Sequence, residues 1–149
     1  MVVIEEVGQL DEALIEDLLH LWERSARATH TFLTEQDITA LRPDVRQGFA
    51  FVHLTLAREN GIVLGFSGIH GDSLEMLFAD AHARGQGLGR SLLLRAIQRG
   101  ISKLDVNEQN PQALHFYEHM GFSVVGRSDT DNQGRPFPLL HMELSSAKN

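Results

Sequence analysis

The chain contains no cysteine, and its 149 residues include only one tryptophan, one tyrosine and four prolines. Without cysteine there can be no disulfide, no thiolate nucleophile and no cysteine-based zinc or iron–sulfur site. Runs of 18 apolar residues are also missing, and the opening residues MVVIEEVGQL lack the basic and apolar regions of a secretory signal. We therefore expect a cytoplasmic protein that does not associate with membranes.

Basic residues are scarce as well. The chain has 13 Lys and Arg against 20 Asp and Glu, which gives a formal net charge of -7. A surface this acidic repels phosphate backbones and anionic lipids, so we expect no nucleic-acid partner. Hydrophobic residues make up 42% and charged residues 22%, as in ordinary soluble globular proteins. The length predicts one domain, residues 1–149.

Hydrophobic periodicity predicts both strands and helices. We expect strands at 2–7, 51–58, 62–69, 74–79, 104–106 and within 124–144. We expect four helices: one at 10–26, a second that begins at 34, a third that follows the glycine-rich segment and ends at about 99, and a fourth at 111–120. Thr34 followed by Asp37 is a helix N-cap signal, and Asn60-Gly61 is a hairpin signal. Asn110 followed by Pro111 is a second N-cap signal, with proline at the first helical position. With no internal repeat and no linker, this order predicts a mixed α/β fold around one sheet.

A glycine-rich segment, residues 84–90 (RGQGLGR), lies between a predicted strand and a predicted helix. Glycines remove the Cβ atoms that would keep a ligand away, so backbone N–H groups can converge on an anion at the helix N-terminus. Residues 81–103 also carry five basic residues and no acid. The segment therefore predicts a phosphate site. Two alternatives would show the same residues: a glycine-rich turn beside a solvated arginine face, and a phosphate-binding protein of an unrelated kind.

The familiar nucleotide loops do not fit this segment. A Walker A loop needs Gly-Lys followed by Ser or Thr, and a dinucleotide fingerprint needs glycine where Arg90 stands. By contrast, LEMLFADAHARGQGLGR (residues 74–90) resembles the acyl-CoA motif of the GNAT superfamily of N-acetyltransferases, with Arg84, Gly87 and Gly89 in its key positions. Downstream, NPQALHFYEHMGF (residues 110–122) resembles the second motif of that superfamily.

The resemblance covers essentially the whole chain and is closest to small bacterial single-domain members. It implies a mostly antiparallel central sheet flanked by helices. It also implies acetyl-CoA as cosubstrate, with its pyrophosphate on the glycine loop and its pantetheine arm along the strand before it. The cofactor-binding residues would be Leu77, Phe78, Ala79, Arg84, Gly85, Gln86, Gly87, Leu88, Gly89, Arg90, Asn110 and Tyr117.

For the chemistry, the resemblance implies direct acetyl transfer to a primary amine, without a covalent intermediate and without metal. Tyr117, the only tyrosine, would protonate the departing thiolate as general acid. Glu75 is the first candidate for the general base, with His70, His30 or water as alternatives. A non-catalytic acyl-CoA sensor is the alternative function, and it would have no need of a phenol beside the sulfur.

The acceptor is predicted only by class, as a small-molecule or peptide amine. The overall acidity favours a cationic amine, and Trp22, His30, Phe32 and Asp129 are candidates by their position in the chain, with Glu23 as a further nearby acid. Either a monomer or a homodimer is compatible with the sequence.

A metal site is not expected. His115 and His119 share one helix face, but they do not form an H-E-x-x-H motif and lack a clear third ligand.

Overall fold

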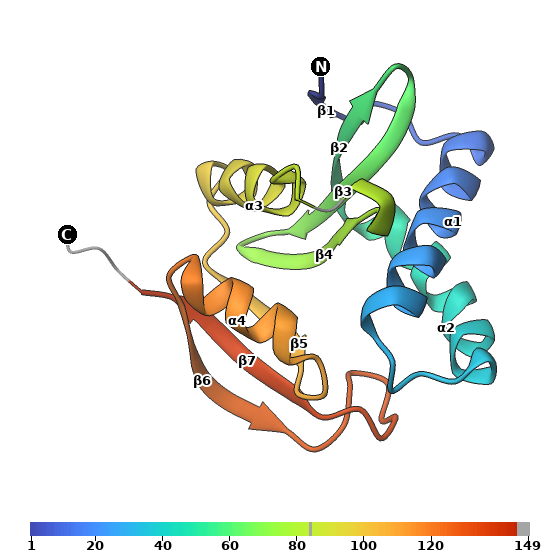
Figure 1. The fold of residues 1–149 in the computed structure, drawn as a ribbon. Helices are drawn as coiled ribbons and strands as arrows, with labels where there is room; N and C mark the ends of the chain where they lie inside the picture. Colours follow the sequence, from blue (N-terminus) through green and yellow to red (C-terminus); the bar gives the residue numbers. More distant parts are fainter. Residues whose placement is uncertain (84, 146–149) are drawn as a thin grey trace. The chain divides into compact units, whose positions relative to one another are not determined.

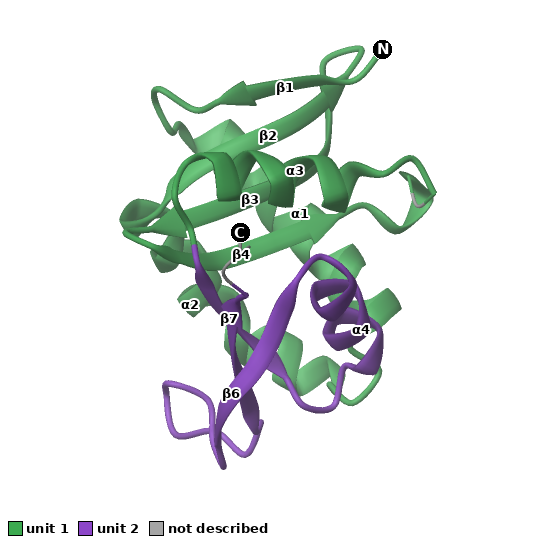
Figure 2. Cartoon of the chain, turned by 90° about the vertical axis from the view of Figure 1, so that its left-hand side faces the viewer, with its two compact units in different colours: residues 1–101 green, residues 102–149 purple. Residues whose placement is uncertain are grey.

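A computed structural model describes residues 1–83 and 85–145 of the chain. These residues form two compact units, residues 1–101 and residues 102–149, coloured green and purple in Figure 2. Each unit has its own strands, helices and buried side chains. The mixed α/β class predicted from the sequence is confirmed, and every strand pair described below is antiparallel.

The first unit contains four strands, β1 (Val3–Glu6), β2 (His53–Glu59), β3 (Ile62–His70) and β4 (Ser73–Ala79). Neighbours in that order pair with each other, so β2 and β3 are central among these strands (Figure 1). The predicted hairpin turn at Asn60-Gly61 joins β2 to β3, and both residues have positive φ, 54° and 81°. Two residues with positive φ are the requirement of a type I′ turn, which explains the Asn-Gly pair.

The helices of the first unit lie on opposite faces of these strands. Helices α1 (Glu12–Thr29) and α2 (Glu35–Gly48) enclose a core with Leu54 and Phe66, whereas α3 (Leu88–Gln98) packs with Ala57 and Leu64. Helix α1 ends at Thr29, three residues beyond the predicted end. Helix α2 begins at the predicted N-cap Thr34, which forms a capping box with Asp37. One-turn 3₁₀ helices follow α2 at 49–51 and β4 at 81–83.

The second unit consists of β5 (Lys103–Asn107), α4 (Pro111–His119), β6 (Phe122–Ser128) and β7 (Leu139–Leu144). Strand β7 pairs with β5 on one side and with β6 on the other. Asn110 caps α4, as predicted, by accepting a hydrogen bond of 3.2 Å from the backbone N–H of Ala113. Helix α4 packs on β5 and β6, and the buried side chains of this unit include Tyr117, Phe122 and Met142.

Among the residues that the structure describes, none of the helices has both the length and the apolar character needed to cross a membrane.

Candidate active site

Strand β4 is followed by Asp80, by the 3₁₀ helix at 81–83 and then by the glycine-rich loop, so the predicted pantetheine and phosphate residues are close in sequence within the first unit. Leu77 and Ala79 pair with Ser67 and Gly65 of β3. Their side chains pack on the α3 side of the strands, whereas Phe78 packs on the α1 side. All three predicted residues of β4 are only partly buried. Hydrogen bonds to β3 thus fix one backbone edge of β4. The N–H and C=O groups on the opposite edge of β4 are oriented as a result.

Two glycines of the loop have positive φ and open surroundings. Gly85 and Gly87 have φ values of 85° and 73°, and an added Cβ at either position would meet no atom within 4 Å. Gly87 is the N-cap of α3, and no side chain of the described residues caps that end of the helix. Leu88 anchors the loop because its side chain is buried, whereas Gln86 is exposed. Open space beside uncapped N–H groups fits a phosphate.

Arg84 lies outside the described residues. The arginines that follow it fall into two groups, according to whether they form an ion pair with a described residue. Arg95 of α3 and Arg99, which follows the last residue of that helix, both bind Glu6 of β1, with N–O distances of 2.7 and 2.9 Å. Arg90 lies in the first turn of α3, is exposed, and makes no ion pair with any residue of 1–83 or 85–145. Arg90 is therefore better placed to bind a phosphate than Arg95 or Arg99.

Asp80, close to the predicted phosphate loop, is a residue that the sequence did not single out. It follows β4 directly and is only 7% exposed. Its carboxylate accepts hydrogen bonds from Arg24 of α1 at 2.8 Å and from the backbone N–H of His82 at 3.1 Å. The available signal was a single acid at the end of an apolar strand, immediately before the glycine loop. Asp80 holds the turn that precedes this loop against α1.

Burial opposes ionisation of Asp80, but the hydrogen bonds from His82 and Arg24 outweigh it and lower the pKa of this carboxyl. Asp80 is therefore a carboxylate at neutral pH, and its charge is matched by the guanidinium of Arg24.

Glu75, the first candidate for the base, is an exposed residue of β4. Its neighbours Leu74 and Met76 pair with Ile69 and Gly68, so Glu75 has no opposite residue on β3 and is the extra residue of a β-bulge. It makes no hydrogen bond or ion pair with a described residue. The exposed position would allow it to receive a proton from solvent or substrate, and none of the described side chains orients its carboxylate by a hydrogen bond or ion pair.

The two alternative histidines are both held by neighbours. Nδ1 of His70 lies 3.1 Å from the backbone oxygen of Phe51. His30, at the end of α1, lies 2.8 Å from the hydroxyl of Thr29 through Nδ1, and its ring contacts that of Phe32 at a centroid distance of 5.4 Å. Burial lowers the pKa of His30, so its imidazole is neutral over a wider pH range than that of an exposed histidine.

Tyr117, the predicted acid, lies in α4 of the second unit, whereas Glu75 and the glycine loop belong to the first. The side chain is 9% exposed and its ring contacts Phe122 in an edge-on arrangement, with a centroid distance of 6.1 Å. Burial raises the pKa of Tyr117, so the phenol keeps its proton at neutral pH. Its hydroxyl makes no hydrogen bond with a described residue. A protonated hydroxyl without a protein acceptor can donate to a ligand.

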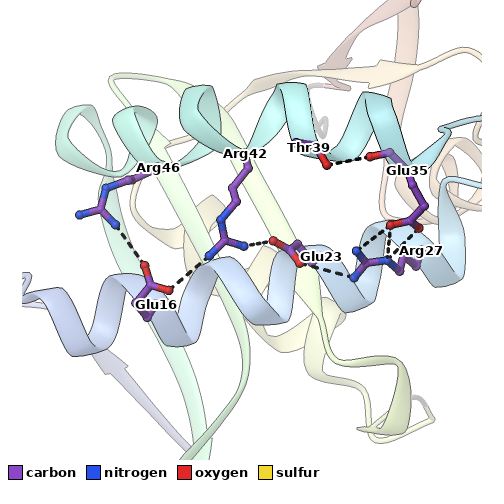
Figure 3. Close-up of polar contacts among 7 residues, drawn as sticks. All are labelled: Glu16, Glu23, Arg27, Glu35, Thr39, Arg42 and Arg46. Atoms are coloured by element: carbon purple, nitrogen blue, oxygen red, sulfur yellow. Dashed lines mark hydrogen bonds and ion pairs between the residues drawn. The ribbon is translucent and has the colours of Figure 1, made fainter.

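Three residues that the sequence suggested for contact with the acceptor, Trp22, Glu23 and Asp129, make contacts within the protein. Figure 3 shows that Glu23 lies between Arg27 and Arg42, which form ion pairs with it, in a network that connects α1 with α2. Its charge is therefore already matched, and Trp22 beside it belongs to the core with 5% exposure. Asp129 is exposed and pairs with Arg127. Trp22 and Glu23 are thus structural residues, not free acceptor ligands.

The two histidines considered as metal ligands lie on α4. His115 and His119 are both exposed on α4. No cluster of three or more His, Asp or Glu with the geometry to hold a metal ion occurs among residues 1–83 and 85–145.

Comparison with known proteins relates this arrangement to a large family. The family described as "Acetyltransferase (GNAT) domain" matches residues 25–146. The chain is 40% identical over 134 residues to the peptidyl-lysine N-acetyltransferase YjaB of Escherichia coli K12, a match that covers 89% of this chain and 91% of that protein.

Solved structures agree with this match. The solution structure of the apo form of E. coli YjaB superimposes with a TM-score of 0.87 at 36% identity, covering 99% of both chains. The PaiA N-acetyltransferase of Thermoplasma acidophilum in complex with coenzyme A has a TM-score of 0.69 at 19% identity, covering 96% of this chain and 99% of that one. At that identity, the second likeness concerns the fold alone.

Proposed function

Because this chain belongs to the GNAT acetyltransferase family, we propose that it transfers the acetyl group of acetyl-CoA to the side-chain amine of a lysine in a peptide or protein. The observation that carries the proposal is the 40% identity, over about nine tenths of both chains, to a peptidyl-lysine N-acetyltransferase. The family match also extends across both units, which supports a single acetyltransferase domain of residues 1–149.

The glycine loop would bind the pyrophosphate of the donor. Gly85 and Gly87 leave open space over the loop backbone, and the N–H groups of the first turn of α3 have no side-chain cap among the described residues. Arg90, which lacks an acidic partner there, would add a positive charge. Arg84 belongs to the same segment of the sequence and matches the first position of the family motif. These features together support phosphate binding.

The pantetheine arm would run along β4. Backbone groups of residues 77–79 on the edge of β4 that faces away from β3 would hydrogen bond to its amides, in the manner of an added strand. Asn110, whose side chain caps α4, would fix the first turn of the helix that carries Tyr117.

Tyr117 would act as the general acid. Attack of an amine on the thioester expels a thiolate, and a phenol that is still protonated can donate its proton to that sulfur. The raised pKa of Tyr117 and the absence of a hydrogen-bond acceptor for its hydroxyl among the described residues both support this role.

The acceptor must lose a proton before it attacks. A lysine ammonium has an ordinary pKa of about 10.4, so at neutral pH nearly all of the acceptor arrives protonated. A general base, or a chain of groups leading to solvent, is therefore required. Glu75 remains a candidate because it is exposed on β4.

A set of three peptides tests this proposal. The first is blocked at its N-terminus and contains one lysine, the second has arginine in place of that lysine, and the third has a free N-terminus and no lysine. After incubation with acetyl-CoA, mass spectrometry should find an acetyl group only on the first peptide. Acetylation of the third peptide alone would refute the lysine acceptor, and binding of acetyl-CoA without any transfer would leave the acyl-CoA sensor.

A further inference from the structure

Lysine is almost absent from this chain, although the function proposed above acts on lysine. Of the 13 basic residues, 11 are arginine and two, Lys103 and Lys148, are lysine. Lys103 is an exposed residue of β5 that lies opposite Glu143 of β7, and Lys148 lies outside the described residues. Guanidinium groups therefore carry nearly all of the positive charge on the side chains.

Most of these guanidinium groups bind acidic side chains. Nine of the 11 arginines form at least one ion pair with a described residue: Arg24, Arg27, Arg42, Arg46, Arg58, Arg95, Arg99, Arg127 and Arg135. We refer to these nine as the paired arginines. Their charges contribute to the contacts that hold each unit together.

The largest group of these ion pairs joins α1 to α2 (Figure 3). Arg42 pairs with Glu16, at an N–O distance of 3.2 Å, and with Glu23. Arg46 pairs with Glu12 at 2.6 Å and with Glu16 at 3.2 Å. The side chains of Arg42 and Arg46 are 32% and 40% exposed. Both are therefore held by acids on α1 and are still accessible from solvent.

Geometry alone does not require arginine at every one of these positions. Arg27 and Arg127 each bind one carboxylate through two nitrogens, an arrangement that suits the planar guanidinium and not an ammonium. Arg24, Arg95 and Arg99 each donate to their acid through one nitrogen. A lysine ammonium can form a single contact of that kind. The absence of lysine from these positions therefore needs a second explanation.

Arginine and lysine also differ in their reactivity toward a thioester. A lysine amine that has lost its proton can attack the acetyl carbon: an N–C bond forms, the C–S bond breaks, and coenzyme A leaves as a thiol. The product is a neutral amide, so a lysine that had been paired with an acid would lose its charge and its ion pair. A guanidinium stays protonated at physiological pH and has no amine to acetylate.

We propose that the paired arginines make the ion pairs between α1 and α2 inert to the acetyl transfer that the protein itself carries out, an inference that rests on the proposed function. A lysine ε-amine at position 42 or 46 would be acetylated by this protein, and the contact between the helices would weaken. With arginine there, acetylation of lysines by the protein on its own copies is confined to Lys103 and Lys148, and the helix network keeps its charges.

The test uses the full-length chain with Arg42→Lys and Arg46→Lys combined. The variant is incubated with acetyl-CoA, the donor is removed, and the protein is analysed by mass spectrometry and thermal unfolding. We expect acetyl groups on both introduced lysines. We also expect a melting temperature about 2–4 °C below that of the same variant incubated with coenzyme A, the scale for the loss of a few exposed ion pairs in a chain of this size. The parent should keep its melting temperature under both treatments.

Two control variants separate the loss of charge from other effects. Arg42→Gln combined with Arg46→Gln carries neutral amides that resemble acetyl-lysine and have no amine. Its melting temperature should be lower than that of the parent and should not respond to acetyl-CoA. Gln47→Lys places a lysine on an exposed position of α2 whose side chain has no described partner. That lysine should be acetylated without a change in melting temperature.

Excess coenzyme A distinguishes transfer by the protein from direct reaction of lysine with the donor. Because it competes for the donor site, it should prevent acetylation of the introduced lysines. Acetylation that continues at the same rate would be direct reaction and would overturn the proposal.

The remaining outcomes separate this inference from the proposed function. A parent that forms no acetyl-lysine on the blocked peptide refutes the proposed function, and the inference with it. A parent that acetylates the peptide while both introduced lysines stay unmodified refutes the inference alone. Acetylation of both lysines without a fall in melting temperature refutes it as well, because the ion pairs would then not depend on a charge that acetylation removes.

Discussion

Arg24 of α1 and Asp80 at the end of β4 form an ion pair with an N–O distance of 2.8 Å, although 56 positions separate them in the chain. Because Asp80 also accepts the backbone N–H of His82, the same carboxylate holds both the helix and the turn that precedes the glycine loop. The loop that we assign to the donor phosphates therefore has a fixed attachment to the core of the first unit.

This ion pair predicts a pH-dependent contribution to stability. The pKa of Asp80 in the folded protein is below its ordinary value of 3.8, so its contribution is present above that pH and is lost as the pH falls through the folded pKa. Asp80→Asn should lower the free energy of unfolding near pH 7 by about 1–3 kcal/mol. Urea unfolding at decreasing pH should show the parent approaching the variant below about pH 4.

The control for this prediction is Asp129→Asn. Asp129 is 90% exposed in its side chain and pairs only with a surface arginine among its described contacts, so its replacement should change stability by less than about 0.5 kcal/mol. A difference between parent and Asp80→Asn that does not change with pH would contradict a role for the charge of Asp80.

The glycine loop gives a second prediction. Gly87→Ala places a Cβ in the space assigned to phosphate and also strains a residue with φ of 73°. The affinity for coenzyme A, measured by titration calorimetry, should fall about tenfold or more, which corresponds to about 1.4 kcal/mol.

Gly134 provides a matched control, because it has φ of 77° and equally open surroundings but lies in the turn between β6 and β7. Gly134→Ala carries a similar backbone strain, and coenzyme A should bind it as it binds the parent. Equal losses in both variants would show that strain, and not obstruction of a phosphate, causes the effect.

Arg90 of α3 and Arg99, directly after that helix, supply a third prediction. Arg90→Gln should weaken coenzyme A binding and reduce its dependence on salt, since an exposed charge on a phosphate is screened over about 8–10 Å at physiological ionic strength. Arg99→Gln should leave binding within about twofold of the parent, because Arg99 is already paired with Glu6. Titrations with coenzyme A and with dephospho-coenzyme A at two salt concentrations decide which phosphate Arg90 binds, and equal effects of the two variants would contradict this division of roles.

Most local structure followed from short-range signals in the sequence. The Thr34 N-cap, the Asn60-Gly61 turn and the Asn110 cap each depend on residues no more than about four positions apart, and each of these predictions is confirmed by the structure. The end of α1 was predicted three residues early because its apolar periodicity ends at Ala26, whereas its last turn is closed by His30 donating its backbone N–H to Ala26.

The tertiary contacts of the site could not be read from the sequence. The pairing of Glu6 with Arg95 and Arg99 joins residues about 90 positions apart, and the pairing of Gly126 with His141 depends on a register shift in β6 that no composition signal marks. The bulge that exposes Glu75 is a property of the pairing between β3 and β4. The partners of such charged and hydroxyl side chains are set by tertiary contacts. The sequence alone offers many equally plausible partners for each of them.

The kinetics of Tyr117→Phe with acetyl-CoA and the blocked lysine peptide test the central claim most directly. The substitution keeps the ring that packs on Phe122 and removes only the hydroxyl. If the chain transfers acetyl groups to lysine with Tyr117 as the acid, the parent forms acetyl-lysine, and Tyr117→Phe binds acetyl-CoA within a few-fold of the parent but has a kcat about 100-fold lower. A parent that forms no acetyl-lysine, or a variant that turns over as fast as the parent, would contradict the account.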